Sequence, residues 1–177
     1  MCIAVKNTIF VTCWILFQQN AMMEKLDKLD TRILNILQKD ASLSTKDIAG
    51  EIGLSVSPTH ERIKRLKSEG YIEKYVALVN REKLGKHLLV LCTVTLKEQS
   101  IATLKNFEES VVQFKEVLEV LCIAGGQDYL LKIVVEDVDD YHTFVVTHLS
   151  SLSNISTLSS SFVLKEIKRE TAFHLNF

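Results

Sequence analysis

Four basic residues lie close together on one predicted helix, and their chemistry suits binding to nucleic acid. They are Arg62, Lys64, Arg65 and Lys67. An arginine can bind guanine O6 and N7 in the major groove of DNA, and a lysine can neutralise a phosphate. We therefore expect this helix to bind double-stranded DNA through its first turn and its basic side, with these contact residues: Ser55, Ser57, Pro58, His60, Arg62, Lys64, Arg65 and Lys67.

Helical periodicity separates an apolar side of this segment from a polar side. Ile63 and Leu66 are three residues apart and are expected to point toward the preceding helices. At about 100° per residue, the opposite side holds Pro58, Glu61, Arg62 and Arg65, with His60 and Lys64 on one flank. A basic face alone is also typical of an ordinary solvated helix, so the preceding turn and helix decide between the two interpretations.

The residues before the basic helix form the pattern of a helix-turn-helix. Ser44 can cap a first helix, and Gly53 supplies the positive φ that ends it. Ser55 and Ser57 then offer hydroxyls that can cap the second helix, and the proline that follows them is tolerated in a first helical turn. The pattern as a whole, over residues 44–72, favours a DNA-binding motif over a solvated surface helix.

A third helix is expected on the N-terminal side of this motif. Apolar residues at helical spacing predict it between Met23 and Lys39, with Asp27 or Asp30 as its cap. Packed behind the other two helices, it would complete a helix-turn-helix domain over residues 23–75. The apolar run Tyr75–Val79 predicts a short strand after that domain.

The remaining chain alternates strands and helices. A strand and hinge linker is expected at 76–86, because it is polar in its second half and contains Gly85. The domain that follows, 87–177, predicts strands at 87–97, 117–124, 128–136 and 155–168 and helices at 101–114 and 139–149. The order β-α-β-β-α-β is that of an α+β, ferredoxin-like domain. Its helices cover one sheet face, so the apolar side chains of the other face predict a dimer formed sheet to sheet.

Composition restricts the class of protein. The chain has 177 residues, a formal net charge of −1, one proline and 47% hydrophobic residues, which indicates an ordered protein and argues against a wholly basic coat protein. Its four cysteines form no C-x-x-C pair, its five histidines have no zinc spacing, and no catalytic nucleophile motif is present. We therefore expect a cytoplasmic protein that is not an enzyme and has no metal and no cofactor.

From about Met23 onward the chain resembles the leucine-responsive/asparagine-regulator (Lrp/AsnC) family of transcription factors. The segments that carry the resemblance are Leu29–Asp40, Ile52–Pro58, Arg62–Ile72, Gly125–Lys132 and Phe162–Lys165. The resemblance implies a winged helix-turn-helix that binds DNA, followed by a ferredoxin-like domain that forms a homodimer and a higher oligomer, a tetramer or octamer. It also implies a small-molecule effector, commonly an amino acid.

The same resemblance implies where the effector binds. The expected residues are Gly125, Gly126, Gln127, Asp128, Tyr129 and Ser160. The glycines leave room for a backbone N–H to meet a carboxylate, and Asp128 can accept from an α-ammonium group. The other interpretation of this loop is a plain tight turn with an aspartate cap. The family often has a Thr-x-Thr pair before the position of Phe162, where this chain has Leu158 and Ser160, and the difference bears on the effector's identity and on the response to an effector.

Residues 1–22 have no counterpart in the family pattern. Their apolar run is too short to span a bilayer of about 30 Å as a helix. We expect translation to begin at Met22 or Met23, with no membrane association; a membrane-tethering segment is the alternative. For the protein as a whole, we expect a sequence-specific, effector-responsive regulator of transcription. The alternatives are a ligand-independent architectural DNA-binding protein and a module whose winged helix binds another protein.

Overall fold

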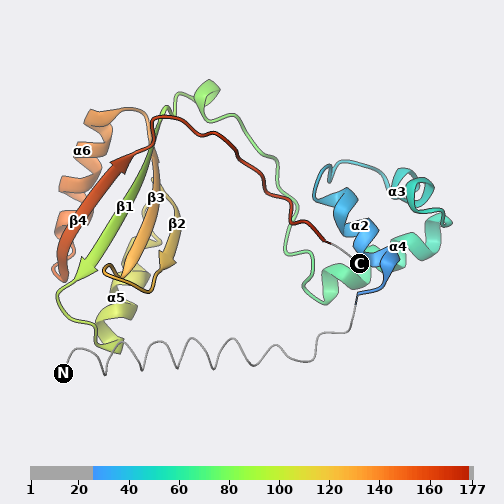
Figure 1. The fold of residues 1–177 in the computed structure, drawn as a ribbon, viewed down its shortest axis with the longest axis horizontal. Helices are drawn as coiled ribbons and strands as arrows, with labels where there is room; N and C mark the ends of the chain where they lie inside the picture. Colours follow the sequence, from blue (N-terminus) through green and yellow to red (C-terminus); the bar gives the residue numbers. More distant parts are fainter. Residues whose placement is uncertain (1–25, 176–177) are drawn as a thin grey trace. The chain divides into compact units, whose positions relative to one another are not determined.

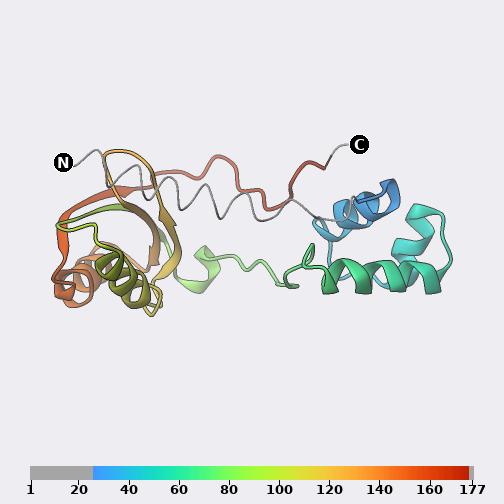
Figure 2. The same ribbon diagram turned by 90° about the horizontal axis from the view of Figure 1, so that it is seen from below.

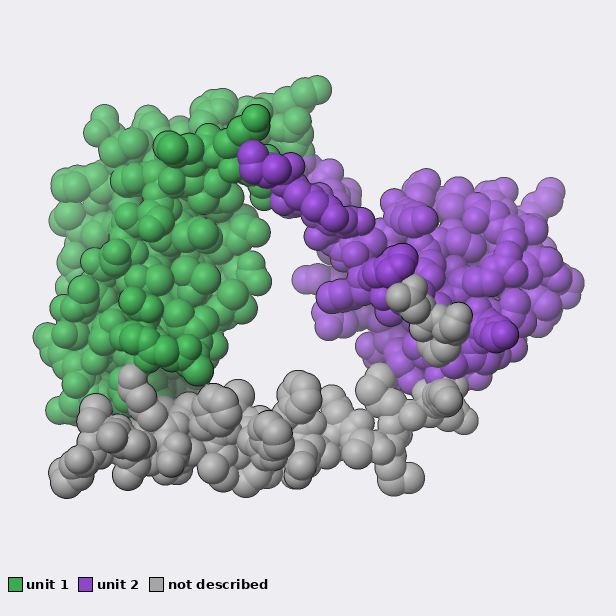
Figure 3. Space-filling model, viewed as in Figure 1, with its two compact units in different colours: residues 1–19, 80–166 green, residues 20–79, 167–177 purple. Residues whose placement is uncertain are grey.

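The structure is a computed structural model that describes residues 26–175. The described chain forms two compact units, coloured separately in Figure 3: residues 26–79 with 167–175, and residues 80–166. The second domain was expected to continue to the end of the chain. In the structure, residues 167–175 group with the helical unit.

The helical unit contains α2 (Lys28–Leu37), α3 (Thr45–Ile52) and α4 (Val56–Ser68). The start of α2 is fixed by a capping box, in which the side chains of Asp27 and Asp30 each accept from the other's backbone N–H. Ser44 and Asp47 form a second capping box at α3. Gly53 ends α3 at φ 76°, as expected for the left-handed residue after a helix.

The start of α4 differs from the prediction. Ser55 is its N-cap residue, but its side chain makes no capping hydrogen bond, and Ser57 lies inside the helix. The hydroxyl of Thr59 instead donates to the Ser55 carbonyl at 2.9 Å. Ser55 is therefore the N-cap residue, as predicted, but the predicted hydrogen bond to its hydroxyl is wrong.

The three helices pack around one apolar cluster, whose buried members are Ile33, Leu34, Leu37, Ile48, Ile52 and Leu66. The predicted strand at Tyr75–Val79 is wrong, since residues 73–80 have no regular secondary structure. Apolar side chains there are largely exposed, and a β-branched run forms a strand only when another strand pairs with it. A short 3-10 helix, η1 (Glu82–Leu84), then ends at Gly85.

The second unit is built on an antiparallel sheet of four strands in the order β2-β3-β1-β4. The strands are β1 (Leu88–Leu96), β2 (Val117–Cys122), β3 (Tyr129–Val135) and β4 (Ile155–Phe162). With α5 (Ile101–Val111) between β1 and β2, and α6 (Val138–Thr147) and the 3-10 helix η2 (Leu149–Ser151) between β3 and β4, the order is the predicted ferredoxin-like one (Figure 1). The last strand ends at Phe162, six residues before its predicted end at Lys168.

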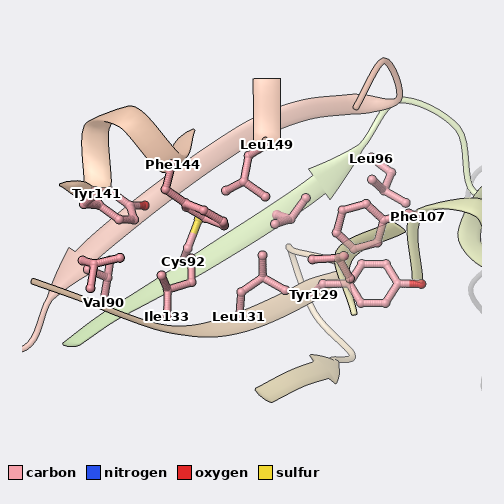
Figure 4. Packing of buried hydrophobic residues seen from close by; sticks show 13 residues of the cluster. Val90, Cys92, Leu96, Phe107, Tyr129, Leu131, Ile133, Tyr141, Phe144 and Leu149 are labelled. Atoms are coloured by element: carbon pink, nitrogen blue, oxygen red, sulfur yellow. The ribbon is translucent and has the colours of Figure 1, made fainter. Parts of the chain in front are cut away.

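Both long helices of this unit lie against the same face of the sheet (Figure 2). Alternate residues of β1 and β3 point into the layer between sheet and helices, where they meet Phe107, Phe144 and Leu149 (Figure 4). No helix among the described residues covers the other face of the sheet. None of the helices within residues 26–175 has both the length and the apolar character needed to cross a membrane.

Candidate nucleic-acid interface and ligand-binding loop

The recognition helix α4 is tied to α2 by a buried carboxylate. Asp30 is 2% exposed, and its two oxygens accept from Arg62 at 2.7 Å and from Arg65 at 2.6 Å. Arg62 also reaches Asp27, at 2.6 Å. The arginines cross from one helix to the other, so charge-assisted hydrogen bonds fix the position of α4 on α2.

This geometry corrects the predicted direction of two side chains. Arg62 and Arg65 were expected to point away from the preceding helices, but their guanidinium groups turn back to α2. The long arginine side chain explains the difference, since helical periodicity places only the Cβ atom. Arg62 is partly buried and Arg65 is 43% exposed, so Arg65 still presents part of its surface to solvent.

The other predicted DNA contacts lie on the exposed side of the helix-turn-helix. Ser55, Ser57 and Pro58 form its exposed first turn, and His60, Lys64 and Lys67 follow along α4, all exposed. The Lys67 ammonium also lies over the Tyr75 ring, 5.8 Å from its centre. The polar face is therefore made by the serines, the histidine and the lysines, while Arg62 and Arg65 join it to the helix behind.

In the second unit, the predicted effector loop connects β2 to β3 and is fastened to the end of β1. The Asp128 carboxylate accepts from the Leu96 backbone N–H at 2.8 Å and from the Gln99 amide at 2.6 Å. The backbone N–H of Asp128 donates to Val94. With both carboxylate oxygens already bonded within the chain, Asp128 holds the loop in place. Gly125, Gly126 and Gln127 form its exposed part.

The side chains of two other predicted effector residues are not part of this exposed turn. Tyr129 is 1% exposed, and its hydroxyl donates to Glu108 at 2.8 Å; burial, then the Glu108 carboxylate, raises the pKa of the phenol far above its usual value. Ser160 lies on β4, where its hydroxyl pairs with that of Tyr141 at 2.5 Å. Strand β1 lies between β4 and β3, the strand that follows the loop. Within one chain, the structure does not bring Ser160 to Gly125–Gln127.

A shallow apolar groove of about 310 Å³ crosses the helix-free face of the sheet. Leucines from three strands line it, together with an ion pair in which Lys132 Nζ lies 3.9 Å from Glu119 Oε2. Its lining residues are Leu89, Leu91, Glu119, Leu121, Leu130, Lys132, Val163 and Glu166. Within residues 26–175, no three His, Cys, Asp or Glu side chains are grouped so that they could hold a metal ion.

Both units match known protein families. A winged helix-turn-helix DNA-binding model matches residues 26–73, and a model of the Lrp/AsnC ligand binding domain matches residues 89–173. The Bkd operon transcriptional regulator of Pseudomonas aeruginosa is 35% identical over 150 residues, which are 85% of this chain and 98% of that protein. The chain belongs to the Lrp/AsnC family of transcriptional regulators.

Solved Lrp/AsnC-type structures agree with the fold. A transcriptional regulator of Neisseria meningitidis, solved in complex with L-Met, has a TM-score of 0.83 and is 34% identical, covering 86% of this chain and 98% of its own. An AsnC family transcriptional regulator from Agrobacterium tumefaciens has a TM-score of 0.81 and 36% identity, covering 84% and 97%. The protein is therefore a DNA-binding transcriptional regulator of the Lrp/AsnC family with a ligand-binding domain.

Reasoning from the sequence of this Lrp/AsnC chain missed Asp30 as a site residue. The signal was present, because Asp30 lies at helical spacing with the apolar residues Ile33 and Leu37 that are buried in the core. A carboxylate on a buried helix side needs a cationic partner. Arg62 and Arg65 of α4 were the available candidates for this partner.

Proposed function

We propose that the protein is a sequence-specific regulator whose DNA affinity responds to an amino acid bound by the C-terminal unit. The proposal of DNA binding rests on the exposed polar face of α4. Hydrogen bonds from Arg62 and Arg65 to Asp30 fix this helix on α2. Ser55, Ser57, Pro58, His60 and the two lysines contact DNA, and Arg65 contributes with its exposed part. Phosphates are bound chiefly by Lys64 and Lys67.

For the effector we propose the exposed loop that precedes Asp128. Gly126 has open space around its Cα, so a ligand carboxylate can come close to the backbone there. The relative solved with L-Met supports an amino acid as the chemical class. Ser160 lies on β4, and the side chain of Tyr129 is buried. Gln127 and a residue of a neighbouring subunit therefore complete the proposed site, with Asp128 in a positioning role.

The helix-free sheet face supports a homodimer. Its leucines line an open groove, and a large apolar patch on a protein surface usually marks an interface. We propose that a second copy of the chain covers this face and that dimers assemble further. Leu91→Asp, in the lining of the groove, is expected to shift the sedimenting species toward the monomer. A mass unchanged by this substitution would contradict the sheet-face dimer.

The function is tested by fluorescence anisotropy with the gene's own upstream DNA and with unrelated DNA of the same length. Each proteinogenic amino acid is added in turn. An effector can change the affinity only if it binds one state or assembly more tightly than another. Preference for the upstream DNA, shifted by one or a few amino acids, is the expected result. No shift with any of them would contradict amino-acid sensing.

The second candidate function is a ligand-independent architectural DNA-binding protein. The exposed lysines of α4 suit phosphate contacts, which carry no sequence information. A steep dependence of affinity on salt with little difference between the two DNAs would favour it over the regulator.

A further inference from the structure

The C-terminal end of the described chain is extended and lies against α2. Side chains at the end of this helix form hydrogen bonds with backbone groups of the segment. The Phe173 N–H donates to Gln38 Oε1 at 2.6 Å, and Gln38 Nε2 donates to the Phe173 carbonyl at 3.3 Å. Asn35 Nδ2 donates to the Leu175 carbonyl at 3.3 Å. One side-chain amide thus satisfies both backbone groups of a residue, as a neighbouring strand would.

The side chains of this segment have different surroundings. Leu175 packs against the apolar cluster of the helical unit, beside the core residues of α2. Phe173 is 79% exposed, and His174 is exposed as well. The helical unit therefore contacts Phe173 through its backbone, and it contacts Leu175 through both backbone and side chain. Phe173 and Leu175 are two positions apart, which is the period of an extended chain.

The helix that receives this segment is also the helix that positions α4. Asn35 and Gln38 lie three residues apart in the C-terminal half of α2 and its cap, while Asp30 lies in its first turn. Contacts at one end of a short helix restrain the whole helix, because a helix of ten residues is marginal without tertiary packing. The docked segment therefore supports the helix from which Asp30 holds Arg62 and Arg65.

We propose that α2 carries a docking surface for an extended peptide, formed by Asn35, Gln38 and the apolar cluster, and that its occupant is this chain's own C-terminal segment, Phe173–Leu175. Docking keeps α2 in the position that supports DNA binding by α4. The part that concerns DNA rests on the proposed function; the docking itself does not.

The experiment compares hydrogen exchange in the full chain, in Leu175→Asp and in His174→Ala. Burying a carboxylate against an apolar cluster is strongly unfavourable, so Leu175→Asp should undock the segment. Amides of α2 are then expected to exchange about tenfold faster or more. His174→Ala is the matched control, one residue away and exposed, and should leave exchange unchanged. Equal α2 exchange in Leu175→Asp and the parent would overturn the proposal.

A variant that ends at Thr171 separates loss of docking from a general loss of folding. A synthetic peptide of residues 168–175 is added at about millimolar concentration, comparable to the effective concentration of a tethered segment. We expect this peptide to restore the protection of the α2 amides from hydrogen exchange. The same peptide with Leu175→Asp should not restore it. Protection that neither peptide restores would overturn the docking interpretation.

DNA titration of the same chains tests the functional half. Leu175→Asp is expected to bind DNA about tenfold more weakly, and His174→Ala like the parent. Faster exchange of α2 with unchanged DNA affinity would overturn the link to DNA binding. If the parent itself bound no DNA, the proposed function would fail, while the exchange data would still decide whether the segment docks.

Discussion

Arg62 and Asp30 join the recognition helix to the helix behind it, with the guanidinium 2.7 Å from a carboxylate that is 2% exposed. Arg62, which was predicted to contact DNA, is thus bonded to Asp30 within the protein. The pair divides the basic residues of α4 into those that hold the helix and those that face solvent. Substitutions can separate the two groups, because only the first should change the stability of the helical unit.

Replacing the shared carboxylate should destabilise the helical unit. Asp30→Ala leaves Arg62 and Arg65 without their buried partner and opens the α2 capping box, so we expect unfolding of this unit to become easier by about 1–3 kcal/mol. This lies below the cost of breaking a fully buried pair, because both arginines are partly exposed. Denaturant unfolding measures it. Glu69→Ala removes only the longer, surface contact of Arg65, at 3.8 Å, and should cost less than about 0.5 kcal/mol.

Lys64 and Arg62 should respond differently to truncation. Lys64→Ala is expected to lower DNA affinity and to reduce the salt slope by about 1, with unfolding unchanged, because Lys64 is exposed. Arg62→Ala should lower both DNA affinity and the free energy of unfolding. Anisotropy titrations at several salt concentrations, paired with denaturant unfolding, distinguish the two. A Lys64→Ala chain with the parental salt slope would argue against a phosphate contact.

Two glycines of the same motif should give opposite results when changed to alanine. Gly53 has φ 76°, so Gly53→Ala should destabilise the helical unit by about 1–2 kcal/mol. Gly50 lies inside α3 with open space around it, so Gly50→Ala should stabilise the unit by about 0.5–1 kcal/mol. Thermal unfolding measures both. A Gly53→Ala chain as stable as the parent would contradict the assigned end of α3, and destabilisation by Gly50→Ala would contradict the open surroundings of Gly50.

The stability of the helical unit should depend on pH through Asp27. Burial raises the pKa of this carboxyl, but the Asp30 N–H and the Arg62 guanidinium outweigh it and hold the pKa below the ordinary value of 3.8. A lowered folded-state pKa gives stability that is present above 3.8 and lost as the pH falls through the lower folded value. Asp27→Asn should therefore flatten the acid limb of stability measured against pH. An unchanged limb would assign the acid sensitivity to other carboxyls.

The sequence predicted those parts of the fold that depend on local chemistry and composition. The cap Ser44 and the terminating Gly53 were identified correctly, and Asp27 was one of the two caps named for α2, because each acts within one turn of the chain. The strand at Leu88–Leu96 also followed, because a run of β-branched and apolar residues is typical of a strand. The strand predicted at Tyr75–Val79 failed for the complementary reason. Its composition suits a strand, but strand formation depends on a partner that local sequence does not specify.

The candidate site was harder to predict, because its contacts join distant segments. Arg62 meets Asp30 across 32 positions, and Phe173 meets Gln38 across 135. Periodicity places a residue on a side of a helix, but a long side chain such as that of Arg62 can reach around it. For the same reason the buried position of Tyr129, next to an exposed glycine turn, could not be inferred from its neighbours in the chain.

Because the C-terminal segment returns to α2, the helical unit is built from two separate stretches of the chain. Residues 80–166 form the other unit and lie between these two stretches in the sequence. A single proteolytic cut in the irregular stretch after α4 would therefore leave two fragments that stay associated through the docked end. The two units would separate only when that end is also released, so limited proteolysis should yield a nicked complex before it yields free fragments.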